Sequence, residues 1–226
     1  MTATHVRVED LVVEHIAPSV VRIELPLPFE DLHVVNAYAV LGDGAVTLID
    51  PGWSNPETEA VLLNALDGLG AGRGDVRRTL ATHSHPDHYT LAVQWQREHD
   101  IPVLLGLGEK PTVDAWDTLP GRFPRQADRL LRAGAPDLAE TIRALPLEPF
   151  EAVMAFGPPA EWLADDQVLD CEGIDIAVRA TPGHTRGHVV FEHLDEGLTF
   201  TGDHILPRIT PSTGHEMEPE PHPLRS

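Results

Sequence analysis

Apolar residues follow a strand-like spacing through the first fifty residues. The stretch from residue 5 to residue 26, HVRVEDLVVEHIAPSVVRIELP, alternates or runs in β-branched residues and is broken by two prolines. Two further apolar runs in VVNAYAVLGDGAVTLIDPG flank Gly42-Asp43-Gly44, and this pattern predicts a β-hairpin. The second run ends at Asp50-Pro51-Gly52, which predicts a turn at the end of a strand.

Helical and strand patterns then alternate. Residues 56–67, PETEAVLLNALD, predict a helix with a proline near its first turn and acidic residues at its positive end. VRRTLAT predicts a short strand over 76–82, a helix is expected from Pro86 to about His99, and IPVLLG predicts a buried strand over 101–106. This alternation is typical of an α/β fold.

The segment 107–165 has a different character, because prolines divide it and its periodic stretches, QADRLLRAG and APDLAETIRAL, are helical. We expect one domain over 1–226 with 107–165 as a helical insertion that covers the site as a lid. A hairpin around Glu172-Gly173 should follow the insertion. The polar, proline-rich tail 211–226 carries no predicted element, and this composition is compatible with disorder.

Composition narrows the function classes. Hydrophobic residues make up 42% and charged residues 23%, as in an ordinary globular protein. The formal net charge of −20 argues against nucleic acid and anionic membranes as partners and leaves a small-molecule substrate. No signal peptide and no run of about 20 apolar residues is present, so we expect a cytoplasmic protein. The single cysteine, Cys171, lacks an activating motif and is predicted to be packed and chemically idle.

Four candidate metal ligands lie within six residues, namely His83, His85, Asp87 and His88 in LATHSHPDHYTL. They follow a predicted strand, and ligand sites in α/β folds gather at the carboxyl ends of strands. His83 and His85 point the same way in an extended loop, so they can share one metal. Asp87 and His88 leave the first turn of a helix at another angle and would serve a second metal about 3.5–4 Å away.

Four motifs in order resemble those of the metallo-β-lactamase superfamily, in its glyoxalase II-like branch. Thr82 to His88 resembles the HxHxDH signature, Asp50-Pro51-Gly52 the buried turn, Thr181 to His188 the TPGHTxGH motif, and Thr201-Gly202-Asp203 the TGD motif. The resemblance implies an αββα sandwich and two divalent metal ions, with zinc as the expected metal and iron or manganese as alternatives. It assigns the ligands of the first metal to His83, His85 and His184, those of the second to Asp87 and His88, and the bridge to Asp203.

The same resemblance places Asp50 and His188 close to the metals without binding them. His204 directly follows Asp203 and on a strand would point away from the metals, so we expect it beside them rather than as a ligand. Asp87 would also be catalytic, by orienting a metal-bridged hydroxide. The remaining histidines, including His15, His33, His99 and His193, are expected to be surface or packing residues.

The sequence departs from the family pattern in two places. The family's second metal has a further histidine on a later strand, but only 23 residues follow Asp203, so the chain is expected to be C-terminally incomplete. The glycine that follows HxHxDH in the family is replaced by Tyr89-Thr90, and HILPRITPS follows the TGD motif. These differences weaken the inference to glutathione thioesters in particular.

The predicted function is metal-dependent hydrolysis of a small thioester, ester or lactone. The alternatives are a mononuclear-iron redox enzyme similar to persulfide dioxygenases, a phosphodiesterase or nuclease of the same superfamily, and a binding module without catalysis. Aromatic and apolar residues of the insertion either line a substrate pocket or pack the insertion onto the core; they are Trp116, Phe123, Phe150, Met154, Phe156 and Trp162. Specific substrate-binding residues and the oligomeric state are not predicted.

Overall fold

The computed structural model describes residues 11–28, 32–116, 124–146 and 154–212. A seven-stranded sheet contains, in spatial and chain order, β1 (Val13–Ala17), β2 (Val20–Pro26), β3 (Val34–Gly42), β4 (Ala45–Ile49), β5 (Val76–Ala81), β6 (Val103–Gly106) and β7 (Glu161–Leu163). The strands from β1 to β4 pair antiparallel, and those from β4 to β7 pair parallel. The predicted hairpin is confirmed, because Gly42 pairs with Ala45 and Gly44 adopts a φ of 68°.

The second sheet has four antiparallel strands in the order β11-β10-β9-β8. They are β8 (Val168–Asp170), β9 (Asp175–Ala180), β10 (Val189–His193) and β11 (Leu198–Phe200). The predicted hairpin between β8 and β9 is confirmed: Asp170 pairs with Asp175, and both Glu172 and Gly173 have positive φ.

Two helices connect the parallel strands. Helix α1 (Pro56–Gly68) begins after Asn55, whose side chain accepts a hydrogen bond from the Thr58 N–H at 2.8 Å. Helix α2 (Pro86–His99) begins immediately after His85, with Pro86 in its first turn, where the absence of an N–H costs nothing. Both helices match the sequence expectations to within a residue.

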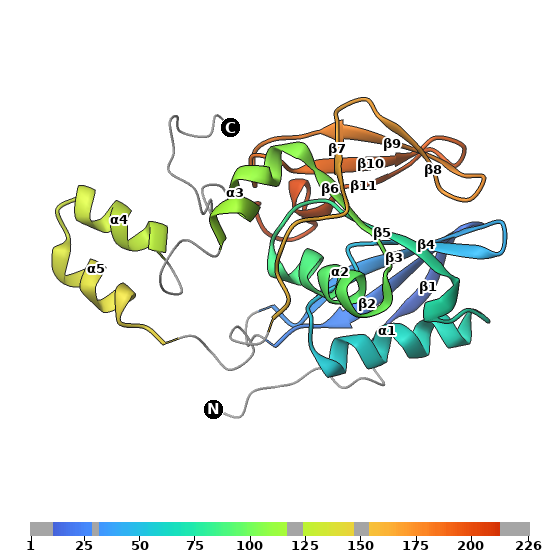
Figure 1. Ribbon diagram of the computed structural model, residues 1–226, viewed down its shortest axis with the longest axis horizontal. Helices are drawn as coiled ribbons and strands as arrows, with labels where there is room; N and C mark the ends of the chain where they lie inside the picture. The colour runs from blue at the N-terminus through green and yellow to red at the C-terminus, as the bar shows by residue number, and fades with distance from the viewer. Residues whose placement is uncertain (1–10, 29–31, 117–123, 147–153, 213–226) are drawn as a thin grey trace.

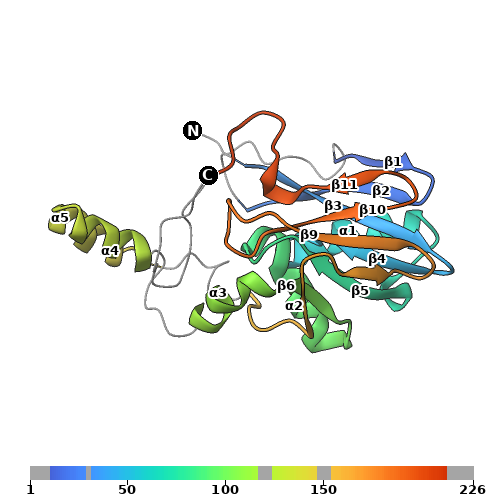
Figure 2. The ribbon, with the colours of Figure 1, turned by 90° about the horizontal axis from the view of Figure 1, so that it is seen from above.

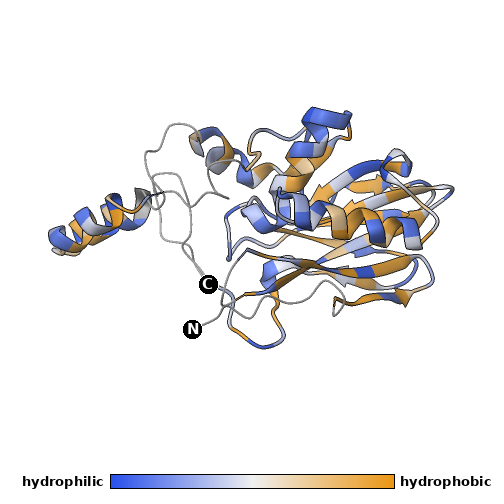
Figure 3. Ribbon diagram, turned by 90° about the horizontal axis from the view of Figure 1, so that it is seen from below, coloured by the Kyte–Doolittle hydropathy of each residue, from blue (hydrophilic) through white to orange (hydrophobic). Residues whose placement is uncertain are grey.

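The layers follow from the alternation of side chains along the strands. On β4, Val46 and Leu48 face α1 and α2, whereas Ile49 faces the four-stranded sheet. Figures 1 and 2 show α1 and α2 on one face of the large sheet and the small sheet on the other. Hydrophobic residues are concentrated on the strands between these layers (Figure 3). The expected α/β sandwich is therefore the observed architecture.

The segment 107–165 contains a short 3-10 turn (Leu107–Glu109) and helices α3 (Lys110–Ala115), α4 (Pro124–Arg132) and α5 (Pro136–Arg143). Helices α4 and α5 lie together and apart from the two sheets (Figures 1 and 2). The end of the segment differs from a purely helical insertion, because Glu161–Leu163 forms β7 and pairs with β6 in the large sheet. The helical part therefore ends before residue 165.

The aromatic residues of this segment that the structure describes pack against one another and the core. The rings of Trp116 and Phe156 stack at 3.8 Å, and Phe156 meets Tyr89 at 5.5 Å. Trp162 packs on the same cluster, and Met154 on the core beside α1. Phe123, Phe150 and most of the tail 211–226 lie outside the described residues. None of the helices within the described ranges is long and apolar enough to cross a membrane.

Candidate metal centre

Three loops meet at one edge of the sandwich. One runs from the end of β5 at Ala81 into α2, the second from the end of β9 at Ala180 to β10, and the third follows β11. The Val189 N–H donates to the Thr82 carbonyl at 2.9 Å and so joins the first two loops. Because each loop leaves the sheets at this edge, motifs about a hundred residues apart come together there.

Four side chains from these loops converge. His83, His85, His184 and Asp203 each offer one ligand atom, and these atoms all lie within 4.8 Å of one another. His184 Nε2 lies 2.9 Å from His85 Nδ1, and the ring of His83 lies 4.6 Å from that of His85. His83 Nε2 is buried and has no hydrogen-bond partner among the described residues. This donor set is able to bind a divalent metal ion.

Asp203 connects this group to His88. Its Oδ2 lies 3.3 Å from His184 Nε2, and its Oδ1 lies 3.4 Å from His88 Nε2. The Asp87 carboxylate lies on the same side of His88, with Oδ2 3.6 Å from Nε2. The two oxygens of one carboxylate therefore face two different groups of candidate ligands, which is the arrangement expected of a bridge.

The orientation of His88 depends on Asp50. Asp50 is buried in a left-handed conformation (φ 50°) and accepts hydrogen bonds from the Thr82 N–H and hydroxyl, both at 2.8 Å. Its Oδ2 also lies 2.9 Å from His88 Nδ1. With a proton held on Nδ1, Nε2, which faces Asp87 and Asp203, is the nitrogen free to exchange its proton for a metal ion. Asp50 therefore lies next to the candidate ligands and positions one of them.

Burial and mutual charge shift the pKa values of the clustered side chains in different directions. Burial lowers the pKa of His83 well below its ordinary value, and the surrounding histidines lower it further, so this ring stays neutral. Burial acts the same way on His88, but the carboxylates of Asp87 and Asp50 outweigh it and raise its pKa well above the usual range. Burial opposes ionisation of Asp203, yet the hydrogen bond and charge of His88 lower its pKa to about 2. Burial raises the pKa of Asp87.

His188 and His204 differ in their surroundings. The ring of His188 is buried and stacks 5.1 Å from that of His83, while its Nδ1 lies 3.0 Å from the Thr181 hydroxyl. Burial and then the neighbouring His184 and His88 lower its pKa to about 3, so it is a neutral packing partner of the cluster. His204 is exposed, with its ring 5.9 Å from that of His188.

The departures after HxHxDH have structural roles. The Tyr89 hydroxyl donates to the Gly157 carbonyl at 2.8 Å, and its ring is fully buried. The Thr90 hydroxyl donates to the Pro86 carbonyl and accepts from the Ser54 N–H at 2.9 Å. Both residues therefore fasten α2 to its neighbours.

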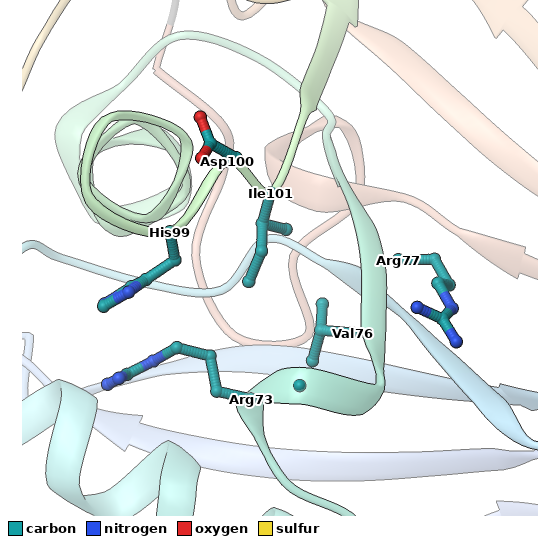
Figure 4. A pocket seen from close by; sticks show the side chains of 7 residues that line it. Arg73, Val76, Arg77, His99, Asp100 and Ile101 are labelled. Carbon is teal, nitrogen blue, oxygen red and sulfur yellow. The ribbon is translucent and has the colours of Figure 1, made fainter.

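A cavity of about 410 Å³ lies at the other edge of the large sheet, where β5 and β6 begin. Figure 4 shows Arg73 and His99 on one side of Val76, and Arg77 directed away from them. Arg73 already pairs with Glu59 at 2.6 Å. This cavity is remote from the histidine cluster, and its lining comprises Arg73, Gly74, Val76, Arg77, His99, Asp100 and Ile101.

The comparisons with known proteins agree with this geometry. The family model described as the metallo-beta-lactamase superfamily matches residues 31–225. The chain belongs to this superfamily. A solved member, the metallo-beta-lactamase family protein TTHA1429 from Thermus thermophilus, is 28% identical with a TM-score of 0.74. That alignment covers 90% of this chain and 65% of the other.

Two curated relatives have a similar level of sequence identity to this chain. An uncharacterized protein of Mycobacterium tuberculosis is 31% identical over 68% of this chain and 65% of its own length. Hydroxyacylglutathione hydrolase GloC of Haemophilus influenzae is 27% identical over 55% of this chain and 47% of its own length. The chain thus spans about half to two thirds of the length of these relatives.

One residue of this superfamily member was not anticipated from the sequence. Glu109 is fully buried and accepts hydrogen bonds from the hydroxyls of Ser84 and Thr185, which lie next to candidate ligands. The only sequence feature that could have indicated Glu109 is its position, three residues after the buried strand that ends at Gly106. A single glutamate at the start of a polar, proline-divided segment gives no indication that it folds inward.

Proposed function

We propose that this chain is a metallo-hydrolase that holds two divalent cations, zinc in the first instance, and hydrolyses a small thioester, ester or lactone. The observation that carries the proposal is Asp203, whose two oxygens face His184 and His88 at 3.3 and 3.4 Å. A single carboxylate shared in this way suits a pair of cations about 3.5–4 Å apart. Such a pair supplies Lewis-acid polarisation of a carbonyl and a water acidic enough to react near neutral pH.

The protein's own residues supply the preorganisation. His83, His85 and His184 present nitrogen donors for the first cation. For the second cation, His88 presents a nitrogen and Asp87 a carboxylate oxygen. Asp50 keeps the proton of His88 on Nδ1 and the lone pair on Nε2. Asp87 lies beside this position and, in the proposal, accepts a hydrogen bond from the attacking water and orients it.

The substrate class rests on the relatives and the charge. A relative named hydroxyacylglutathione hydrolase matches 55% of the chain, and three other relatives are named probable metallo-hydrolases. A net charge of −20 disfavours polyanions such as RNA and DNA as substrates and favours a small molecule.

The test is metal content together with turnover. Protein purified without added metal is analysed by elemental mass spectrometry, beside a His83→Ala control, and then assayed on thioester, ester, lactone and phosphodiester substrates. Close to two zinc ions per chain, lost in the control, and turnover of a carbonyl substrate would support the proposal. A single iron would favour redox chemistry instead, phosphodiester turnover alone would favour the nuclease alternative, and no metal in either protein would refute the site.

A further inference from the structure

Glu109 occupies an unusual position for a carboxylate. Its side chain is fully buried at the turn between β6 and α3, although it is not one of the candidate ligands. The hydroxyl of Ser84 donates to Oε2 at 2.5 Å, and the hydroxyl of Thr185 donates to Oε1. Ser84 and Thr185 are themselves only 3% and 2% exposed, so all three groups are shielded from water.

The two donors belong to the two loops that carry the histidine ligands of the first cation. Ser84 lies between His83 and His85, and Thr185 directly follows His184. One carboxylate thus joins loops about a hundred residues apart in the chain. Hydrogen bonds to an ionised group in a site closed to water are among the stronger ones, and their loss leaves a buried acceptor unsatisfied.

The backbone around Glu109 is shaped for this contact. A Cβ atom at Gly108 would lie 2.6 Å from the Gly187 Cα, and one at Gly187 would lie 2.7 Å from the Glu109 Cα. Real Cβ atoms do not approach so closely, so glycine on both sides lets the β6–α3 turn pass directly over the 184–188 loop. This crossing brings the Glu109 carboxylate within reach of both hydroxyls.

We propose that Glu109 is a positioning residue that holds the two histidine loops at the separation needed for metal binding. The inference deepens the proposed function and rests on its metal site. Glu109 touches neither metal nor substrate in this proposal; it acts through Ser84 and Thr185 on the relative placement of His83, His85 and His184. A pre-set spacing means that less of the binding free energy is used to order the loops.

The molecule contains a matched control. Glu196, in the β10–β11 turn, accepts hydrogen bonds from the Ser19 N–H at 3.0 Å and from the Ser19 hydroxyl at 2.9 Å. Glu196 thus also joins two loops through a serine. The β10–β11 turn, however, follows the end of β10 that is farther from the histidine cluster. Glu196→Gln therefore removes a partly buried charge without touching a ligand loop.

The experiment measures the zinc affinity of the purified full chain by chelator competition, and the absorption spectrum of the cobalt(II) form. Glu109→Gln and Thr185→Val should each weaken zinc binding about 10–100-fold, the range known for groups that support metal ligands. The double variant should be little weaker than Glu109→Gln alone, since the Thr185 hydrogen bond that Thr185→Val removes is one of the two that Glu109→Gln already disturbs. Thr185→Ser, which keeps the hydroxyl, should restore the wild-type affinity and cobalt spectrum, and Glu196→Gln should leave both unchanged.

The outcomes separate the two hypotheses. Zinc affinity and cobalt spectra that are unchanged in folded Glu109→Gln and Thr185→Val would overturn the positioning role and leave the proposed metal site standing. Equal losses in Glu109→Gln and Glu196→Gln would also overturn it, because a general effect on stability would then suffice. If Glu109→Gln does not fold, the Thr185→Val and Thr185→Ser pair decides the question. If the wild-type chain binds no zinc, the proposed function and this inference fail together.

Discussion

Replacing Asp50 by asparagine tests how the cluster directs a histidine lone pair. The buried carboxylate accepts from two groups of Thr82 and faces His88 Nδ1 at 2.9 Å. An asparagine side chain has one acceptor oxygen, so its amide group must face at least one of these partners. Asparagine also tolerates the left-handed backbone at this position, which limits the perturbation to the side chain.

The most informative outcome concerns the tautomer of His88. An amide N–H beside Nδ1 favours the lone pair there and moves the proton to Nε2, the atom that faces Asp87 and Asp203. A proton on Nε2 blocks metal ligation by that nitrogen. We expect the affinity for the second cation to fall about 10–100-fold, which corresponds to about 1.4–2.7 kcal/mol. The first cation should be affected less, because Asp50 reaches a ring proposed to bind that cation only indirectly, through the Thr82 hydroxyl, which lies 3.1 Å from His83 Nδ1.

The assay is stepwise zinc titration against a chelator, with the tautomer followed by long-range nitrogen–proton NMR of the histidine rings. Asp100→Asn is the matched control: Asp100 also has a positive φ, at 57°, but lies exposed at the end of α2. Retention of both zinc affinities in Asp50→Asn would refute the reasoning. So would an equal loss in Asp100→Asn.

Three further predictions use other parts of the molecule. Gly187→Ala should prevent folding or abolish metal binding. Gly183→Ala in the same loop should be tolerated, because a Cβ atom added there meets nothing within 4 Å. Circular dichroism compares the folding of the two variants, and chelator competition compares their metal affinity. Cys171 is fully buried and burial raises its pKa, so a thiol reagent at about pH 8 should label it only after unfolding; rapid labelling of the native protein would contradict the packing. In the metal-free protein, the raised pKa of His88 stabilises the folded state. This stabilisation is complete below about pH 6.5 and is lost as the pH rises through the folded-state pKa. The Tm of the metal-free protein should therefore decline at alkaline pH, and bound zinc should abolish the decline.

The elements whose patterns were most regular are those that the sequence predicted best. Helix α2 has the predicted bounds because Pro86 permits a start and the left-handed Asp100 ends it. The β8–β9 hairpin was predictable from Glu172-Gly173. By contrast, β7 was missed because three residues, Glu161–Leu163, are too few for a periodic signal, and pairing with β6 rather than intrinsic propensity makes them a strand.

The residues of the candidate site also differ in how well the sequence predicts them. Motifs predict which side chains take part, because metal ligation requires particular residue types at particular spacings. They do not predict Glu109, because its role depends on three loops crossing: the glycines at 106, 108 and 187 allow the backbones to touch, and only then does the carboxylate reach Ser84 and Thr185. A glutamate in a polar segment is normally solvated, so burial at this position follows from tertiary contact alone. The residues that position the candidate ligands thus include one in the β6–α3 turn, which no ligand motif or ligand spacing identifies.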